Sequence, residues 1–171
     1  VRGQNNVQGA CDMGVLPNLF PGYQEVTDPA VRAKFAAAWG IDPALMDDQV
    51  GTRITEVPHK ALTGEIKAYY IMGEDPLQTE ADLGLVRKGI EALDFVVVQD
   101  IFMTKTAEMA DVLLPATSWG EHGGVFTCAD RGFQRFEQAI PPAGNVKRDW
   151  EIISLLASEL GYPMHYENNQ Q

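Results

Sequence analysis

The sequence IKAYYIM at Ile66–Met72, together with FVVV at Phe95–Val98, decides the fold of this chain. Each apolar run ends at a polar turn, and the segment between them, Thr79–Leu93, carries apolar residues at three- and four-residue spacing. That spacing is typical of an amphipathic helix. Two apolar strands joined by one helix predict a right-handed βαβ unit whose parallel sheet is covered on both faces. The predicted fold class is therefore α/β.

Polar side chains gather where the predicted strands end. Asp75 follows the first strand, Gln99 and Asp100 follow the second, and Thr79 begins the intervening helix. Ligands of open parallel sheets bind beyond the carboxyl ends of the strands. We therefore expect these four side chains to line one crevice, where carboxylates would accept hydrogen bonds from guanine or ribose donors. The alternative is that the aspartates only form turns and cap helices.

Further helices, a strand and a hairpin complete the predicted secondary structure. Asp28 as N-cap and Pro29 as the first helical residue predict a helix that runs to Trp39 and stops at Gly40. The other expected elements are a loop and short helix in Val1–Gly14, an ordered surface loop over Pro17–Pro29, a helix over Thr52–Leu62 that Pro58 kinks or breaks, a short helix over Lys105–Ala110, a strand over Asp111–Pro115, β-like pieces at Val125–Thr127 and Phe133–Phe136 that pair as a hairpin or lie against the sheet, and a final helix over Asp149–Leu160.

Length, composition and charge exclude several classes of protein. The 171 residues suit one domain, and contents of 45% hydrophobic and 22% charged residues are ordinary for a soluble chain. No apolar run approaches the roughly 18 residues that span a bilayer. The net charge of −11 disfavours a nucleic-acid surface, which needs clustered Lys and Arg. We expect neither a membrane segment nor a nucleic-acid partner.

Common catalytic and metal-binding signatures are missing from the sequence. It contains no GxSxG, P-loop, HExxH or GxGxxG motif. His59, His122 and His165 are scattered, and none is expected to act as a metal ligand or general base. Cys11 and Cys128 lie far apart without a CxxC or His-spaced partner, so the sequence predicts no metal site and favours a reducing compartment.

Four segments resemble a known family. They are VRGQNNVQGACDMGVLPNLFPGY at residues 1–23, AYYIMGEDPLQTEADL at 68–83, VVVQDIFMTKTAEMADVLLPATSWGEHGGVFTCADRGFQRF at 96–136 and DWEIISLLASELGYPM at 149–164. Together they are similar to the large catalytic subunit of molybdenum- or tungsten-dependent formate dehydrogenases, within the wider bis-molybdopterin guanine dinucleotide oxidoreductase family. The resemblance implies that residues 1–171 are one molybdopterin guanine dinucleotide-binding domain of a larger multidomain enzyme. It also implies a Rossmann-like three-layer α/β/α fold, with a mainly parallel sheet and a small β-hairpin excursion.

The resemblance implies roles for eight residues. Arg2 matches the family's active-site arginine beside the metal, and its planar fork suits a carboxylate substrate such as formate. Gln4 matches a neighbouring cofactor contact. Ala116 stands where relatives place Ser, so only a backbone contact with the cofactor would remain there. The other implied cofactor-binding residues are Asp75, Thr79, Gln99, Asp100 and Asp149.

The same resemblance places the rest of the machinery outside this chain. The selenocysteine or cysteine that ligates the metal, its neighbouring histidine and the cysteines of an iron–sulfur cluster would lie N-terminal to it, and a second cofactor-binding domain C-terminal. The implied partners are these remaining domains and electron-transfer subunits, and the implied reaction interconverts formate and carbon dioxide. The isolated chain is expected to be inactive, and the parent to be cytoplasmic or, alternatively, periplasmic. Two other functions stay open: a nitrate-reductase-like relative with another substrate, and a non-catalytic nucleotide-binding module.

Overall fold

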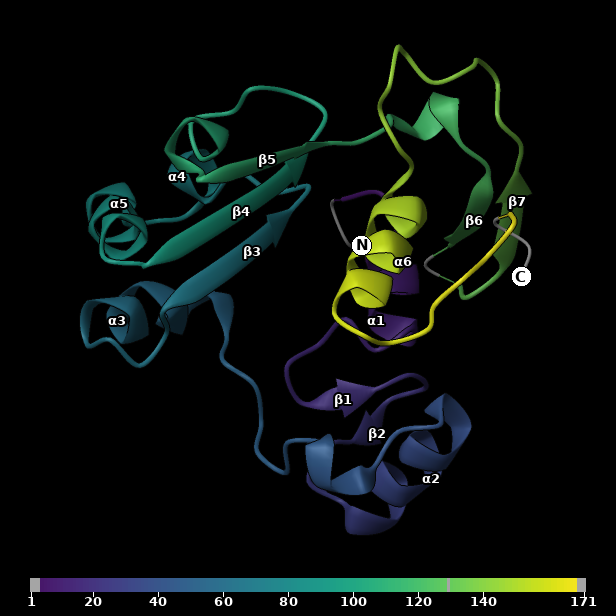
Figure 1. Cartoon of the computed structure of the whole chain (residues 1–171). Coiled ribbons are helices and arrows are strands. Elements are labelled where there is room, and N and C mark those ends of the chain that lie inside the picture. Colours follow the sequence, from purple (N-terminus) through teal and green to yellow (C-terminus); the bar gives the residue numbers. More distant parts are fainter. Residues whose placement is uncertain (1–3, 129, 169–171) are drawn as a thin grey trace. The chain divides into compact units, whose positions relative to one another are not determined.

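The computed structural model describes residues 4–128 and 130–168. The chain divides into two compact units, one made of Val1–Arg53 and Val125–Arg135, the other of Ile54–Gly124 and Phe136–Gln171 (Figure 1). The elements in chain order are α1 (Val7–Asp12), β1 (Leu19–Phe20), β2 (Gln24–Glu25), α2 (Pro29–Trp39), η1 (Pro43–Leu45), η2 (Ile54–Glu56), α3 (Val57–Leu62), β3 (Ala68–Met72), α4 (Pro76–Thr79), α5 (Leu83–Glu91), β4 (Phe95–Asp100), η3 (Ala107–Met109), β5 (Val112–Pro115), η4 (Trp119–Glu121), β6 (Gly124–Thr127), β7 (Phe133–Phe136) and α6 (Asp149–Glu159), where η denotes a 3₁₀-helix.

The second unit is built on a three-stranded parallel sheet in the order β3-β4-β5. Tyr70 pairs with Val97, which pairs with Val112, and Met72 stands beside Gln99 in the same register. The predicted β–α–β arrangement with parallel strands is therefore confirmed, and a third strand extends it. The carboxyl ends of all three strands lie at one edge of the sheet, where the polar residues that follow the strands were expected to gather.

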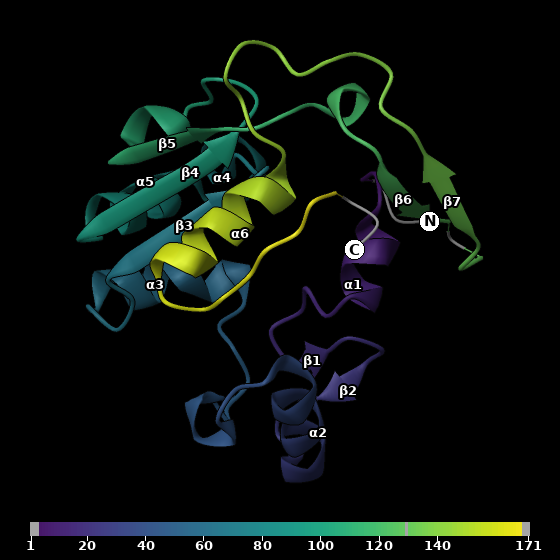
Figure 2. The same cartoon turned by 45° about the vertical axis from the view of Figure 1, so that its right-hand side comes forward.

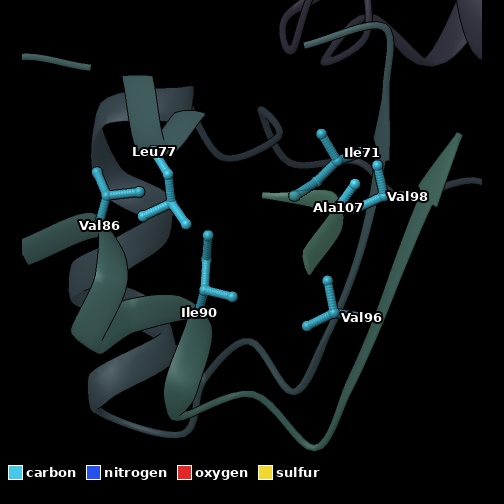
Figure 3. Close-up of a cluster of buried hydrophobic side chains, with 7 residues drawn as sticks. All are labelled: Ile71, Leu77, Val86, Ile90, Val96, Val98 and Ala107. Atoms are coloured by element: carbon cyan, nitrogen blue, oxygen red, sulfur yellow. The ribbon is translucent and has the colours of Figure 1, made fainter. Parts of the chain in front are cut away.

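One face of this sheet carries the hydrophobic core. Because side chains alternate along a strand, Ile71, Val96 and Val98 share a face, and all three are buried. The core side chains are Ile71, Leu77, Val86, Ile90, Val96, Val98 and Ala107 (Figure 3). They come from β3, α4, α5, β4 and η3, so this core ties the helices between the strands to the sheet.

The predicted helix over Thr79–Leu93 is divided in the structure. Pro76 opens the short helix α4, and Glu80 then adopts an extended conformation that ends it. A new start follows at Asp82, whose Oδ1 accepts a hydrogen bond from the Leu85 N–H (2.9 Å) and caps α5. Sequence periodicity predicted a helix in this segment, but its start at Thr79 was wrong, because Thr79 ends α4 and α5 begins at Leu83.

The opposite face of the sheet carries the side chains of Tyr70, Met72 and Val112 with Gln99 among them. Figure 2 shows α6 in front of β3 and β4, with α3 and α5 behind the sheet. Met72 nevertheless remains 50% exposed and Phe95 46% exposed. The described residues therefore bury the core face around Ile71, Val96 and Val98, and cover the opposite face only in part.

Two further predicted helices differ from expectation in their first turns. The segment predicted over Thr52–Leu62 is a 3₁₀ turn, η2, that runs into α3. Pro58 lies in the first turn of α3, where the backbone N–H that proline lacks would have no partner within the helix. The segment predicted over Lys105–Ala110 contracts to the single 3₁₀ turn η3. The final helix, α6, begins at Asp149 as predicted.

The first unit is organised around α2. Asp28 Oδ1 accepts the Ala30 N–H at 2.8 Å, and Gly40 ends the helix in the left-handed conformation, as the sequence predicted. Phe20, Phe35 and Trp39 form an aromatic cluster with ring centroids 4.8–5.8 Å apart. Phe20 lies on the small hairpin β1–β2, which was expected only as an ordered loop.

The N-terminal loop of the first unit is tied to strand β6. Asn6, at a positive φ, accepts the Thr127 N–H through Oδ1 (2.9 Å) and donates through Nδ2 to the Val125 carbonyl (3.3 Å). Strand β6 pairs with β7, so the expected hairpin is confirmed. In the part of the chain that the structure describes, no helix combines the length and hydropathy that crossing a bilayer requires.

Candidate functional site

Asp75 begins the site at the end of β3. Its Oδ1 accepts hydrogen bonds from the Thr106 N–H (3.1 Å) and hydroxyl, and its Oδ2 accepts one from Gln78 Nε2. Burial raises the pKa of this carboxyl, but the hydrogen bonds from Thr106 and Gln78 outweigh it and hold the pKa below its usual value. Asp75 is therefore an ionised acceptor whose orientation is fixed by Thr106, a residue that sequence reasoning did not single out.

Thr79 lies one helical turn beyond Asp75. Its hydroxyl donates to Glu74 Oε1 at 2.6 Å and lies 3.2 Å from the Asp75 carbonyl oxygen. The Thr79 N–H also bonds that carbonyl, at 3.1 Å. The structure thus brings Asp75 and Thr79 together in one turn, with the exposed Thr79 hydroxyl held between two acceptors.

Gln99 and Asp149 meet across 50 positions of sequence. Gln99 Nε2 donates to Asp149 Oδ1 at 2.5 Å, and Gln99 Oε1 accepts a hydrogen bond from the Tyr70 hydroxyl. The first residue of α6 is thereby joined to β4 and β3. Tyr70 was not predicted to take part, because its neighbours in the sequence give no sign that it lies beside Gln99.

Asp100 and Ala116 use their polar groups within the local backbone. Asp100 Oδ1 accepts the N–H groups of Ile101 (2.6 Å) and Phe102 (3.2 Å), which closes the turn after β4. The Ala116 N–H donates to the Asp100 carbonyl at 3.2 Å. Asp100 therefore serves first as a turn former, which was the alternative considered for it, and the backbone N–H of Ala116 is already committed.

The eight residues singled out by sequence are not all placed together. Within the second unit the structure pairs Asp75 with Thr79, Gln99 with Asp149, and Asp100 with Ala116. The side chains of Asp75 and Asp100 bind different partners, so each carboxylate has its own surroundings. Gln4 belongs to the first unit and is exposed. Arg2 lies outside the described residues.

A pocket of about 430 Å³ adjoins Asp149. It is lined by His122, Gly123, Gly124, Asp149, Trp150, Tyr166 and Asn168. Three of these side chains are aromatic rings, one is a carboxylate, and none is a lysine or arginine. Such a lining suits a planar, neutral ring system with N–H groups and is unfavourable for a phosphate. The conspicuous runs WGEH and RDW contain three of the lining residues, His122, Asp149 and Trp150, and were the available sequence signal.

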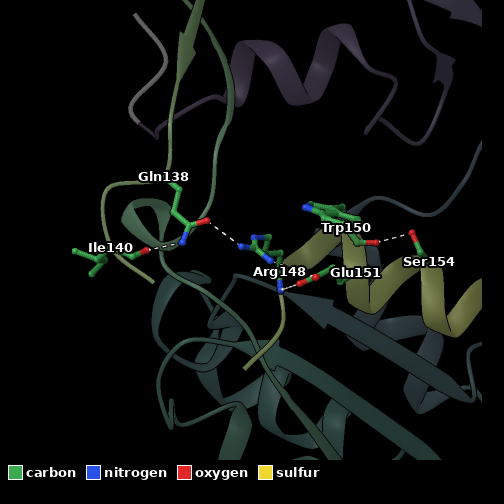
Figure 4. Close-up of polar contacts among 6 residues, drawn as sticks. All are labelled: Gln138, Ile140, Arg148, Trp150, Glu151 and Ser154. Carbon is green, nitrogen blue, oxygen red and sulfur yellow. Dashed lines mark hydrogen bonds and ion pairs between the residues drawn. The ribbon is translucent and has the colours of Figure 1, made fainter. Parts of the chain in front are cut away.

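The start of α6 is braced where it meets this pocket (Figure 4). Glu151 Oε2 accepts the Arg148 N–H at 2.8 Å, and Arg148 Nη2 donates to Gln138 Oε1 at 2.9 Å. The Trp150 carbonyl accepts the Ser154 hydroxyl at 2.7 Å. These bonds fix the backbone that presents Asp149 and Trp150.

Among residues 4–128 and 130–168, two buried side-chain atoms lack a hydrogen-bond partner: Trp150 Nε1 and Thr117 Oγ1. A buried polar group without a hydrogen bond is costly, by about 1–3 kcal/mol, so native proteins usually pair it. Trp150 also lines the pocket, and its N–H is a donor only. Trp150 therefore contributes an aromatic ring to the pocket and carries a buried donor without a partner, while Asp149 supplies an acceptor there.

Metal ligation is a separate matter from ring binding. Within the described ranges, no three or more His, Cys, Asp or Glu side chains are arranged to hold a metal ion.

The fold is a mixed α/β unit built on a three-stranded parallel sheet, a class of fold whose ligands commonly bind beyond the carboxyl ends of the strands. Comparison with known families is consistent with this class: the sequence profile described as Molybdopterin oxidoreductase matches residues 2–159. The chain belongs to the molybdopterin oxidoreductase family. Membership implies a molybdopterin-type cofactor carrying molybdenum or tungsten.

Individual relatives agree with this family. The chain is 64% identical over 171 residues to formate dehydrogenase H of Escherichia coli K12, covering all of this chain and 24% of that protein. It is 46% identical over 162 residues to the F420-dependent formate dehydrogenase 1 subunit alpha of Methanococcus maripaludis, covering 94% of this chain and 23% of that one. The chain thus spans about a quarter of the length of these relatives.

A solved structure resembles the fold. Acetylene hydratase from Pelobacter acetylenicus matches with a TM-score of 0.62 and 27% sequence identity, over 70% of this chain and 18% of that one. The likeness supports a mixed α/β architecture with a parallel sheet. The different reaction in that enzyme's name indicates that the architecture alone does not set the substrate.

Proposed function

We propose that this chain is the molybdopterin guanine dinucleotide-binding domain of a formate dehydrogenase, which interconverts formate and carbon dioxide. The observation that carries the proposal is the 64% identity with formate dehydrogenase H along the whole chain. Identities of 46–48% with three archaeal formate dehydrogenase alpha subunits support the same substrate. Because all of these relatives are about four times longer, the activity belongs to the full-length polypeptide, and the 171-residue chain alone should be inactive.

The fold assumed in this proposal is the Rossmann-like three-layer α/β/α arrangement, with residues 1–171 acting as one domain. The position of α6 supports it, since Asp149 bonds Gln99 from the face of the sheet opposite the core. The incompletely buried second face is consistent with a layer completed by the rest of the polypeptide. An iron–sulfur cluster and electron-transfer subunits would likewise be contributed from outside this chain.

The residues of the second unit would bind the nucleotide arm of the cofactor. Asp75 is an ionised carboxylate with a fixed orientation, and the Thr79 hydroxyl is exposed beside it. Both suit the N–H groups of guanine or the hydroxyls of ribose. At the neighbouring pocket Asp149 supplies an acceptor, and Trp150 supplies an aromatic ring against which a planar group could stack. When bound, the cofactor's molybdenum or tungsten would supply the two-electron chemistry.

Arg2 and Gln4 would act beside the metal. A guanidinium presents two parallel N–H donors, which can bind and orient the carboxylate of formate and balance its charge. Lysine keeps the charge but loses the fork. We therefore assign Arg2 the role of orienting the substrate and Gln4 that of a cofactor contact.

Metal analysis and formate-dependent dye reduction by the full-length protein test the proposal, with the 171-residue chain as the control. The full-length protein should contain molybdenum or tungsten and oxidise formate, and the 171-residue chain should do neither. Arg2→Lys should retain the metal and lose most formate turnover. A metal-free or formate-inert full-length protein would overturn the proposal. The proposal would also be overturned if the full-length enzyme reduced nitrate but did not oxidise formate, and if Arg2→Lys abolished the nitrate reduction.

A further inference from the structure

Tyr70 occupies a position to which sequence and family assign no role. It lies on β3, on the face of the sheet away from the core, next to Gln99. Its hydroxyl donates to Gln99 Oε1, and Gln99 Nε2 donates to Asp149 Oδ1 at 2.5 Å. The three side chains form a continuous hydrogen-bonded chain from the sheet to the first residue of α6.

The chemistry of the two ends fixes the orientation of the amide in the middle. An ionised carboxylate only accepts hydrogen bonds, so the Gln99 NH₂ group must face Asp149. Its carbonyl oxygen must then face Tyr70, whose hydroxyl can donate. A flipped amide would place two acceptors together at Asp149, so Asp149 selects the orientation, and the Tyr70 hydroxyl stabilises it by donating to the Gln99 oxygen and holding the side chain in place.

Burial separates the roles of the three residues. Gln99 is 1% exposed, which leaves its side chain no surface for a ligand, whereas Asp149 lines the 430 Å³ pocket. Tyr70 does not line that pocket either. Of the chain Tyr70–Gln99–Asp149, only the last residue reaches the space where a ligand would lie.

We propose that Tyr70 is a positioning residue, which acts through Gln99 to hold the Asp149 carboxylate in its ligand-binding orientation. Gln99 is then also a positioning residue, and its contribution to cofactor binding passes through Asp149. This inference rests on the proposed function, because it takes Asp149 as a cofactor contact. It adds Tyr70 to the site and changes how Gln99 contributes.

Tyr70 is suited to act as a donor throughout the physiological range. Burial raises the pKa of its hydroxyl, and the negative charge of Asp149 raises it further. The phenol therefore stays protonated and keeps donating to Gln99. A phenylalanine in its place would leave the buried Gln99 oxygen without this donor.

The test is a double-mutant cycle in the full-length holoenzyme, with the rate of cofactor loss as the readout. Loss is followed as released metal and released pterin fluorescence under mild denaturation. Tyr70→Phe should accelerate loss about tenfold, the usual effect of leaving one buried polar group unpaired. Asp149→Asn should accelerate it at least as much, and the double variant should lose cofactor no faster than Asp149→Asn alone.

Tyr69→Phe provides the matched control. It makes the same chemical change one residue away, on the opposite face of β3, and should leave the rate of cofactor loss unchanged. Gln99→Glu adds a second readout, the pH dependence of cofactor loss, which should not change if these residues only fill space. Its carboxyl can donate to Asp149 only when protonated, so cofactor loss should accelerate as pH rises.

The outcomes separate the two proposals. If Asp149→Asn retains cofactor normally, the role of Asp149 in the proposed function is wrong, and the inference falls with it. If Asp149→Asn loses cofactor but Tyr70→Phe does not, or if the two effects multiply, the inference alone is wrong. Equal effects of Tyr69→Phe and Tyr70→Phe, or a Gln99→Glu rate that is independent of pH, would also overturn it.

Discussion

Asp75 illustrates how one side chain at the end of a strand can serve both the fold and a site. The Thr106 side chain is completely buried, and its hydroxyl donates to Asp75 while accepting the Leu77 N–H at 3.2 Å. Removing the carboxylate would leave buried donors on Thr106 without a partner. The stability of this corner and the orientation of the carboxylate that we propose binds the cofactor therefore have one cause.

Asp75→Ala should lower the free energy of unfolding of the 171-residue chain by about 1–3 kcal/mol at neutral pH, the usual cost of leaving buried donors unpaired. The pKa of Asp75 is lowered from its ordinary 3.8 in the folded state. Its ionised form therefore stabilises the fold fully above that ordinary value, and the benefit is lost as pH falls through the lower folded-state pKa. Urea denaturation at several pH values should show the difference between wild type and variant shrinking in acid.

Asp94→Ala is the control for this prediction. Asp94 is an exposed aspartate before β4, and its substitution should change stability by less than about 0.5 kcal/mol. An Asp75→Ala chain as stable as Asp94→Ala, or a difference that grows toward acid pH, would contradict the role of Asp75.

Local residues could be predicted from sequence, whereas long-range partners could not. Asp28 and Gly40 are recognised because a cap depends on groups two to four positions away. Thr106 lies 31 positions from Asp75, and Tyr70 lies 29 from Gln99. Their contacts are created by strand register, which no short motif records. The resemblance supplied several site positions, but it did not supply the partners that hold them.

At the scale of elements, the sequence identified the strands and most helices but not their internal breaks. Apolar runs mark β3 and β4 because the two strands pair in a parallel sheet that packs helices against it. The hairpin β1–β2 pairs only two residues on each side, too few for a recognisable alternation. The division between α4 and α5 depends on the extended backbone of Glu80, which no short pattern in the sequence marks.

The packing of α3 against α5 gives the element-scale prediction. A Cβ added at Gly89 of α5 would lie 2.7 Å from Pro58 Cα and 2.8 Å from Pro58 Cβ, so the two helices would have to separate. Gly89→Ala should therefore destabilise the chain by about 1–3 kcal/mol in urea denaturation, although alanine is the better helix former.

Gly84, in the first turn of the same helix, is the matched control. A Cβ there would meet only Asp82 Oδ1, at an ordinary 3.5 Å. Gly84→Ala should leave stability unchanged or raise it by up to about 1 kcal/mol. If Gly89→Ala is as stable as Gly84→Ala, the close approach of α3 and α5 is wrong.

At the scale of the whole molecule, the second face of the sheet is the feature that the chain leaves incomplete. Tyr70, Met72, Phe95 and Val112 are large apolar residues on this face, and each is more than a third exposed. Parallel sheets are normally covered on both sides. Relatives about four times longer have ample further sequence with which to cover it.

The isolated 171-residue chain should therefore self-associate through this face as its concentration is raised, and the full-length protein should not. The net charge of −11 opposes association, so raising the ionic strength to about 0.15 M, where the screening length is about 8 Å, should strengthen it. Sedimentation velocity at two salt concentrations would measure both effects.

Met72→Lys should weaken association, because it places a charge in the centre of the buried contact. Leu45→Lys, at a 79% exposed residue of the first unit, should not. If the chain stays monomeric at every concentration, or if Met72→Lys and Leu45→Lys weaken association equally, the second face of the sheet is not the surface through which the chain associates.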